Sequence, residues 1–403
     1  MAFISFLCCL VYFTSYLTRL NYGACLIEIQ RALQIDKSQA GLPVTGCFLV
    51  YGIGQLICGY IGDKIAPQKI IFTGLVGSAL CNLLVAVFPR IAVITLIWSV
   101  NGFFQSMLWP PLVRIMAELL DGKWYRHCSV LVSFSSSLAT VAVYLLAPVC
   151  LFAWGWKSMF FLPAVAGILT AVYWIVNIRS QGRETIQEEN PSTPVPEEPQ
   201  GGIIRLFLLA PLFPMLTAIA LHGVLKDGIT TWMPAYMADA FGTSTSTAIL
   251  TTAILPVFAI CSTLFSSLLY NRIRDELCTA ALLFAAGFAG STAMFFTNAR
   301  YPIGCVLLMM LITGCMHGIN LMLISRLPRH FVKFGMVSTV SGILNAATYV
   351  GSALSTYVFG KIAENSGWNH VILLWIAVSG IATILLLGCR RKWKSFLERK
   401  DIG

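Results

Sequence analysis

The stretch Gly59-Tyr-Ile-Gly-Asp-Lys64 ends one apolar run, and a related stretch, Ser267-Leu-Leu-Tyr-Asn-Arg272, ends another 208 residues later. In both stretches a small polar side chain, Asp or Asn, stands directly before a basic one. A second match lies at nearly the same offset, because Arg114 has a counterpart in Arg326, 212 residues further on. Few residues are identical, but a nearly constant offset favours two parallel repeats of one structural unit, a plan found among membrane transporters.

The composition around these motifs is too apolar for a soluble protein. Of the 403 residues, 57% are hydrophobic and 11% are charged, with a mean hydropathy of +0.79. Soluble domains have roughly 45–50% apolar and about 25% charged residues, and a helix that crosses a bilayer needs about 20 residues, which leaves room for about twelve helices. We therefore expect an all-α polytopic membrane protein. A soluble enzyme, a single-span receptor and, despite the net charge of +10, a nucleic-acid-binding protein are excluded.

Twelve apolar runs divide into two sets of six, which predicts two pseudo-symmetric halves of six transmembrane helices each. The runs cover residues 3–26, 38–62, 67–88, 91–120, 128–152, 156–178, 205–237, 243–270, 276–297, 301–325, 333–362 and 367–389. Between the sets lies a polar, proline-rich segment of the kind that does not pack into a core. The predicted organisation is a helical bundle over residues 1–178, a flexible linker over 179–204 and a second bundle with a basic tail over 205–403.

The basic residues predict how the chain is oriented in the membrane. Eighteen Lys and Arg residues fall on the side of the two termini and the linker, and six fall on the opposite side. Cytoplasmic loops carry the excess of positive charge in membrane proteins. We therefore expect both termini and the linker in the cytoplasm, and a multi-pass protein of the cell membrane, more specifically a bacterial inner membrane.

Five charged residues stand inside the predicted helices and are the first candidates for function. Holding a charge there costs roughly 2.5–3.5 kcal/mol by insertion scales, so such residues face a partner or a water-filled cavity. The five residues are Arg19, Arg114, Glu118, Lys226 and Asp227.

Arg19 and Lys226 are candidates for binding an anion. Tyr12, Tyr16 and Arg19 are spaced four and three apart, so two phenols and a guanidinium share one helix face. Lys226 follows Arg19 by 207 residues, which is close to the repeat offset and would give each half one cation at a similar depth. Two alternatives remain: Arg19 extends to the outer surface, or Lys226 pairs with Asp227 or another acid, although adjacent helical residues do not face each other.

Arg114 and Glu118 are four residues apart, a spacing that favours an ion pair within one helix. Together with Asp63 and Lys64 they predict a structural latch at the cytoplasmic mouth, with a gating role. In the same run, Trp109-Pro-Pro111 predicts a kink, because two prolines remove two backbone donors. Gln105 and Trp109 share a face of this helix.

His222 and His317 fall within predicted helices and could relay protons, and His317 is the better candidate for a cavity. A satisfied core or gating histidine is the competing interpretation. The sequence contains no phosphate-binding loop, zinc-protease motif or Ser/His/Asp signature, and its 13 cysteines lack metal-ligand spacing. We therefore expect no catalytic residue, no metal and no cofactor, and an ion or counter-substrate gradient as the energy source.

Several motifs resemble those of the major facilitator superfamily. The spacing Gly59-x-x-x-Asp63-Lys64-x-x-x-x-Lys69 is similar to the superfamily's loop motif between its second and third helices. Further stretches resemble the organophosphate:phosphate antiporter family, which includes glycerol-3-phosphate and hexose-phosphate transporters. They are Tyr16-Leu-Thr-Arg19-Leu-Asn21, Gly102-Phe-Phe-Gln-Ser-Met-Leu-Trp-Pro-Pro111 with Arg114, Lys226-Asp-Gly-Ile-Thr-Thr-Trp-Met-Pro-Ala-Tyr236, and the run from Gly314 through Leu327-Pro328.

The resemblance implies roles for particular residues. In that family one arginine on the first helix and one on the seventh grip the phosphoryl group; Arg19 matches the first, and Lys226 takes the place of the second. Tyr12, Tyr16, Gln105 and Trp109 match residues that line the family's pocket.

Besides Lys226, three positions depart from the family pattern: Leu20 and Thr231 replace a frequent lysine and acid, and Ala139 stands near the place of a histidine. Because a lysine lacks the bidentate fork of an arginine, the departure at Lys226 leaves open a carboxylate or a phosphate ester of different size.

The sequence thus predicts a secondary active transporter of an anionic organic solute, most of all a sugar phosphate or glycerol phosphate exchanged for inorganic phosphate by alternating access. Its partners would be the solute and the lipid bilayer, and we expect it to function as a monomer. Two alternatives stay open. One is a proton-coupled carboxylate or drug transporter of the same fold, and the other is a transporter-like sensor of a sugar phosphate.

Overall fold

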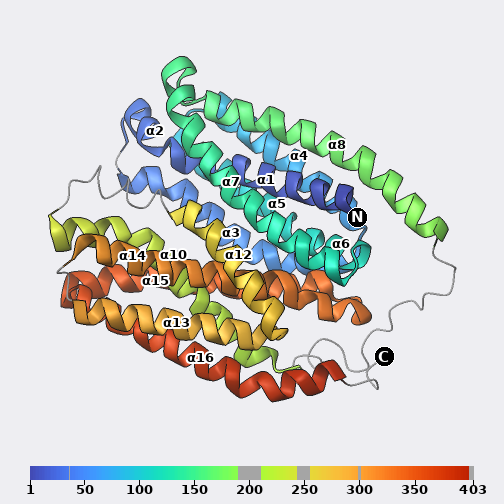
Figure 1. The fold of residues 1–403 in the computed structure, drawn as a ribbon. Coiled ribbons are helices and arrows are strands. Elements are labelled where there is room, and N and C mark those ends of the chain that lie inside the picture. The colour runs from blue at the N-terminus through green and yellow to red at the C-terminus, as the bar shows by residue number, and fades with distance from the viewer. Residues whose placement is uncertain (36, 189–209, 243–254, 298–300, 399–403) are drawn as a thin grey trace. The chain divides into compact units, whose positions relative to one another are not determined.

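The computed structural model describes residues 1–35, 37–188, 210–242, 255–297 and 301–398. In this part of the chain every regular element is a helix (Figure 1). The chain divides into two compact units, one made of Met1–Glu197 with Phe331–Ile343 and the other of Glu198–His330 with Leu344–Gly403. The segment Phe331–Ile343 thus belongs to the first unit, although it follows most of the second in sequence.

The first unit is built from helices that pack along their lengths. α8 lies along α4 (Figure 1) and also contacts α1. α3 packs against α5. The helices are α1 Ala2–Ala24, α2 Leu26–Leu33, α3 Lys37–Lys64, α4 Pro67–Val87, α5 Ile91–Ser106, α6 Trp109–Leu119, α7 Gly122–Trp154 and α8 Ser158–Glu188.

In the second unit α13 lies along α16 (Figure 1). α10 packs against α14 and α16. After α14 the chain continues through a π-helical turn, η1, and a 3₁₀ turn, η2, before α15 begins within the segment that belongs to the first unit. The elements are α10 Leu212–Phe241, α12 Leu255–Ile273, α13 Glu276–Thr297, α14 Pro302–Ile319, η1 Asn320–Arg326, η2 Leu327–Phe334, α15 Val337–Ser366 and α16 Trp368–Glu398.

Ten helical stretches of the described residues are long and apolar enough to cross a membrane. Each of the twelve predicted runs contains a helix, and α12 and α15 are the two that fall outside the ten. Residues 205–209 and 243–254, where two predicted runs begin, lie outside the described residues. The chain is an all-α, multi-pass membrane protein, as its composition predicts.

The predicted kink at the proline pair is confirmed as a break between α5 and α6. Pro110 and Pro111 have no N–H to offer the carbonyls of Ser106 and Met107, so the regular ladder cannot continue. At this point Met107 and Leu108 bond back three residues instead of four, at 3.2 Å each. The break places Trp109 at the start of a new helix, α6.

Two helix boundaries differ from the predicted ones. α8 continues to Glu188, ten residues past the predicted end at 178, so the first part of the predicted linker is helical; residues 189–204 lie outside the described part. α7 begins at Gly122 because the carboxylate of Asp121 accepts hydrogen bonds from the backbone N–H groups of Lys123 and Trp124, at 2.9 and 2.8 Å. Such an N-cap satisfies donors at a helix start that have no partner within the helix.

A buried polar network joins α1, α4 and α5 in the first unit. The side-chain amide of Asn21 donates to Asn82 Oδ1 at 2.7 Å, and Asn82 in turn donates to the Thr18 carbonyl at 2.9 Å. Asn101 donates to the same carbonyl at 3.2 Å and accepts from Ser78 Oγ at 2.7 Å. Because the bilayer interior offers no water to polar groups, this network fixes how α1 stands against its neighbours.

We expect the packing of α3 on α5 to fail when Gly102 gains a side chain. A Cβ at Gly102 would overlap the backbone carbonyl of Cys47, which can move only with its helix. Gly102→Ala should lower the stability of the detergent-solubilised protein by about 1–3 kcal/mol, the usual cost of overpacking. Thermal unfolding followed by tryptophan fluorescence measures this change. Gly23→Ala is the matched control, because nothing lies within 4 Å of a Cβ at Gly23; equal melting temperatures for the two variants would contradict the prediction.

Candidate functional site

Arg19 of α1 lies among aromatic rings in the first unit. Its guanidinium carbon is 4.5 Å from the centre of the Tyr16 ring and 5.1 Å from that of the Tyr51 ring, so it makes cation–π contacts with both. Tyr51 of α3 is 4% exposed. The guanidinium is therefore held against protein side chains inside a membrane-spanning helix. Tyr51 was not among the predicted site residues, because its only signal in the sequence is that of an aromatic residue in an apolar run.

Tyr12 connects this cation to Trp109. The Tyr12 ring centre is 5.1 Å from that of Tyr16 and 4.8 Å from that of Trp109, which begins α6 after the proline break. Trp109 is 4% exposed, and its indole Nε1 finds no hydrogen-bond acceptor among the described residues. A buried N–H without an acceptor is uncommon and calls for an explanation, such as a water or a ligand. The structure thus brings four predicted residues together: Tyr12, Tyr16, Arg19 and Trp109.

Gln105 uses its side chain within the helix packing. Its amide nitrogen donates to Thr18 Oγ1 at 2.8 Å and to Ser78 Oγ at 2.7 Å, and the residue is 2% exposed. Both donors of the amide are thus engaged in the polar network of α1, α4 and α5. Gln105 holds Thr18, the neighbour of Arg19, and so helps to position α1.

In the second unit, α10 carries Lys226 and Asp227. Lys226 Nζ lies 3.4 Å from Asp227 Oδ1, so the ion pair that the sequence left open is present although the two residues are adjacent. Adjacent residues of a helix point in different directions, but the long, flexible lysine side chain can curve around the helix and reach its neighbour. The other carboxylate oxygen of Asp227 accepts a hydrogen bond from the hydroxyl of Ser352 on α15.

Two histidines lie near this ion pair. His222 is fully buried, and its Nε2 is 2.9 Å from the carbonyl of Met316 on α14. His317, the next residue of α14, is half-buried. Both imidazoles are close enough to Lys226 and Asp227 to interact with their charges. The second unit thus gathers one cation, one carboxylate and two histidines inside predicted membrane spans.

Arg114 and Glu118 form the predicted ion pair, with Arg114 Nε 2.7 Å from Glu118 Oε1. Arg114 also donates from Nη1 to the carbonyl of Gly62, at 2.7 Å, near the end of α3. Lys64, at that end, places its ammonium 4.6 Å from the centre of the Tyr60 ring.

Asp63 caps the start of α15 within the first unit. Its two carboxylate oxygens accept from the backbone N–H groups of Ser338 and Thr339, at 2.8 and 2.6 Å. An anion at a helix N-terminus satisfies unpaired donors and interacts favourably with the helix dipole. These contacts support the predicted structural part of the latch, and the gating role stays a prediction.

We expect Asp63→Ala to destabilise the protein by about 1–2 kcal/mol, because the first-turn donors of α15 lose their acceptor. Glu118→Ala is the matched control: it removes an acid from the same region but breaks a partly exposed pair within one helix, worth about 0.3–0.5 kcal/mol. Melting temperatures in detergent compare the two variants. A larger loss for Glu118→Ala would show that the cap on α15 is not the stronger link.

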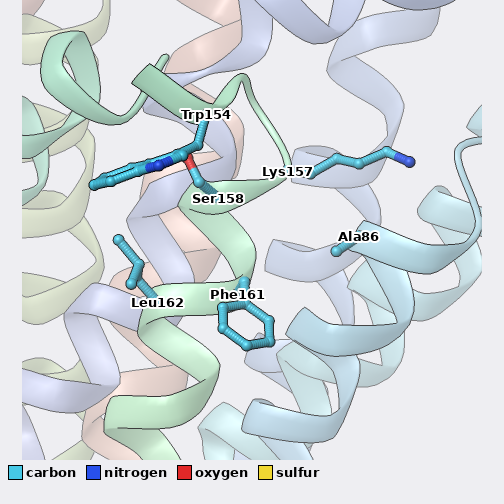
Figure 2. Close-up of a pocket in the computed structure, with 6 residues that line it drawn as sticks. All are labelled: Ala86, Trp154, Lys157, Ser158, Phe161 and Leu162. Carbon is cyan, nitrogen blue, oxygen red and sulfur yellow. The ribbon is translucent and has the colours of Figure 1, made fainter. Parts of the chain in front are cut away.

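A groove of about 480 Å³ opens on the first unit beside α7 and α8 (Figure 2). Most of the lining side chains are apolar, and Lys157 is the one charged residue among them. None of the predicted site residues lines this groove. It is lined by Ala86, Trp154, Lys157, Ser158, Phe161 and Leu162.

The fold, with its membrane-spanning helices and charges held inside them, is that of a multi-pass membrane transporter. Residues 8–356 match the model of the Major Facilitator Superfamily, and the chain belongs to this family. The family and its fold are those of transporters rather than enzymes.

Curated relatives align over nearly the whole chain at low identity. The glycerol-3-phosphate transporter of Bacillus subtilis is 24% identical, with 92% of this chain and 88% of the relative covered. A probable hexose phosphate transport protein of Chlamydia trachomatis is 22% identical, with 92% and 87% covered. The membrane sensor protein UhpC of Escherichia coli is 20% identical, with 92% and 88% covered.

Solved structures agree on the fold. A bacterial homologue of the iron transporter ferroportin, in an outward-facing state, superposes with a TM-score of 0.76 at 13% identity, with 97% of this chain and 99% of that chain covered. The proton:xylose symporter XylE superposes with a TM-score of 0.71 at 14% identity, with 95% and 94% covered. At these identities the likeness concerns the fold alone.

Proposed function

We propose that the protein is a secondary active transporter of an anionic organic solute, an organophosphate exchanged for inorganic phosphate by alternating access. The observation that carries the proposal is the Arg19 cluster. In it a guanidinium contacts the rings of Tyr16 and Tyr51 inside a membrane span, near a buried Trp109 whose N–H finds no acceptor in the described part of the chain. Relatives named as glycerol-3-phosphate and hexose phosphate transporters support the same solute class.

The geometry of Arg19 suits an oxyanion. Contact with two ring faces restricts the orientation of the guanidinium, and the planar fork of an arginine matches a phosphate with two parallel hydrogen bonds. Trp109 adds a buried N–H donor that has no acceptor among the described residues, so an oxygen of the solute could accept its hydrogen bond. Tyr12 and Tyr16 would shape the same pocket, and Gln105 would position α1 behind it.

Lys226 would supply the second positive charge to the solute, with His317 nearby. Asp63, Lys64, Arg114 and Glu118 would gate the cytoplasmic side, with both termini in the cytoplasm of a bacterial cell and the monomer as the functional unit. The match to UhpC favours one further candidate, a sensor that binds a sugar phosphate without moving it.

Purified protein in liposomes loaded with inorganic phosphate should exchange it for external phosphate, glycerol 3-phosphate or glucose 6-phosphate. Arg19→Ala should weaken the apparent affinity by on the order of 10- to 100-fold, because hydrogen bonds to a charged group contribute roughly 1.5–3 kcal/mol. Arg19→Lys should fall between, since it keeps the charge but loses the fork. Uptake of labelled phosphate measures these changes.

Lys157→Ala is the matched control, because it removes a basic residue at the groove rather than at the Arg19 cluster. It should leave the exchange unchanged. Wild-type protein that neither binds nor moves any of the three phosphates would rule out the proposed function. Saturable binding without flux would favour the sensor.

A further inference from the structure

α10 and α15 approach each other closely in the second unit, and glycines allow this approach. A Cβ at Gly223 would overlap the carbonyl of Thr348, and a Cβ at Gly351 would overlap that of Ala220. Small residues at helix contacts let two backbones come together inside a membrane. The contact places Ser352, the residue after Gly351, directly against α10.

Ser352 links the two helices through Asp227. Its hydroxyl bonds to Asp227 Oδ2 and lies 3.0 Å from the carbonyl of Thr348 and 3.4 Å from that of Gly223. A hydroxyl can donate to a carboxylate or accept from a carboxylic acid. Ser352 can therefore satisfy Asp227 in its ionised and in its protonated form without a change of partner.

The charged and titratable groups that act on Asp227 come from α10 and α14. Lys226 Nζ is 3.4 Å away, and the imidazoles of His222 and His317 interact with the pair. From α15 the contact is the Ser352 hydroxyl. α16 also packs on α10, but among the described residues it brings no charged side chain that interacts with Asp227.

With Asp227 ionised, Lys226 and Asp227 together carry no net charge. An anion that binds Lys226 must then share one cation with a carboxylate next to it, and like charges in one site favour proton uptake by one of them. A proton on Asp227 leaves the full positive charge of Lys226 to the solute. The adjacent acid therefore makes Lys226 a weak anion site at high pH and a stronger one at low pH.

We propose that Asp227 is a proton-binding site that takes up one proton from water when an anion binds to Lys226, and returns it to water when the anion leaves. This inference rests on the proposed function, because it needs an anion at Lys226. Linkage makes the coupling reciprocal: the proton raises the affinity for the anion, and the anion raises that for the proton. Net movement of the solute would then carry a proton with it, whereas a one-for-one exchange of phosphates would not.

The test compares phosphate affinity in wild-type protein and in Asp227→Asn between pH 5.5 and pH 8.5, in the same proteoliposome assay. The ratio of the two affinities cancels the effect that the ionisation of phosphate itself has on binding, because this effect is the same for both proteins. Asn resembles the protonated acid, so the variant should bind more tightly than wild type at high pH. Before an anion binds, Lys226 and the Ser352 hydroxyl both favour the carboxylate form of Asp227, so the proton enters together with the anion. Below the pH at which the anion-bound form takes up this proton, the affinity of wild type should rise by up to about tenfold per pH unit relative to the variant.

Asp239→Asn is the matched control, since Asp239 is an exposed acid on the same helix that accepts a hydrogen bond from Trp368 Nε1 at 3.0 Å. Its ratio to wild type should not depend on pH. Ser352→Ala keeps both charges but removes a donor that favours the carboxylate, so it should bind phosphate more tightly than wild type at the upper end of the range.

A second measurement needs no variant. Adding inorganic phosphate to weakly buffered wild-type protein should take up about one proton for each anion bound, after correction for phosphate ionisation. A ratio for Asp227→Asn that does not change with pH, or binding without proton uptake, would overturn the inference and leave the proposed transport function standing. Weaker binding by Asp227→Asn at every pH would also overturn it, because Asp227 would then only hold Lys226 in place. Wild-type protein that binds no phosphate at any pH would overturn both proposals.

Discussion

The hydrogen bonds that Thr18 accepts hold α1 against α4 and α5, and the rest of the first unit depends on this packing. Its carbonyl accepts hydrogen bonds from Asn82 and Asn101, and its hydroxyl accepts one from Gln105. Three side chains from α4 and α5 thus meet at one position of α1. Inside a bilayer these groups have no water as an alternative partner. The constraint fixes α1 against its neighbours, and the adjacent Arg19 is held where Tyr16 and Tyr51 flank it.

The fold could be predicted well because a membrane makes the helix signal strong. A helix that crosses a bilayer must be apolar over most of its length. The apolar run 276–297 therefore has the same first and last residues as the helix α13, Glu276–Thr297. The proline pair marked the break before Trp109 for an equally direct reason. The ends that reach beyond the apolar run were less predictable, since nothing in the polar residues after 178 forbids a helix as far as Glu188.

The site could be predicted only in part, because helical spacing describes one helix at a time. It grouped Tyr12, Tyr16 and Arg19 on one face and paired Arg114 with Glu118, and both arrangements are present. It could not find Tyr51 or Ser352, which reach Arg19 and Asp227 from other helices. Gln105 was predicted to line the pocket, but its side-chain amide donates both of its hydrogen bonds to Thr18 and Ser78 within the helix packing. Its position on one helix could not reveal these partners on other helices.

The proline break also has a mechanical consequence. The regular backbone hydrogen bonds of α5 stop before α6 begins. The eleven residues of α6 therefore form a short helix that can tilt as a unit without bending α5. Trp109, at the first residue of α6, contacts Tyr12. Arg114, in the middle of α6, donates a hydrogen bond to the carbonyl of Gly62 near the end of α3. A displacement of the indole by a fraction of its own width would therefore be passed to the residue next to Asp63, the cap of α15.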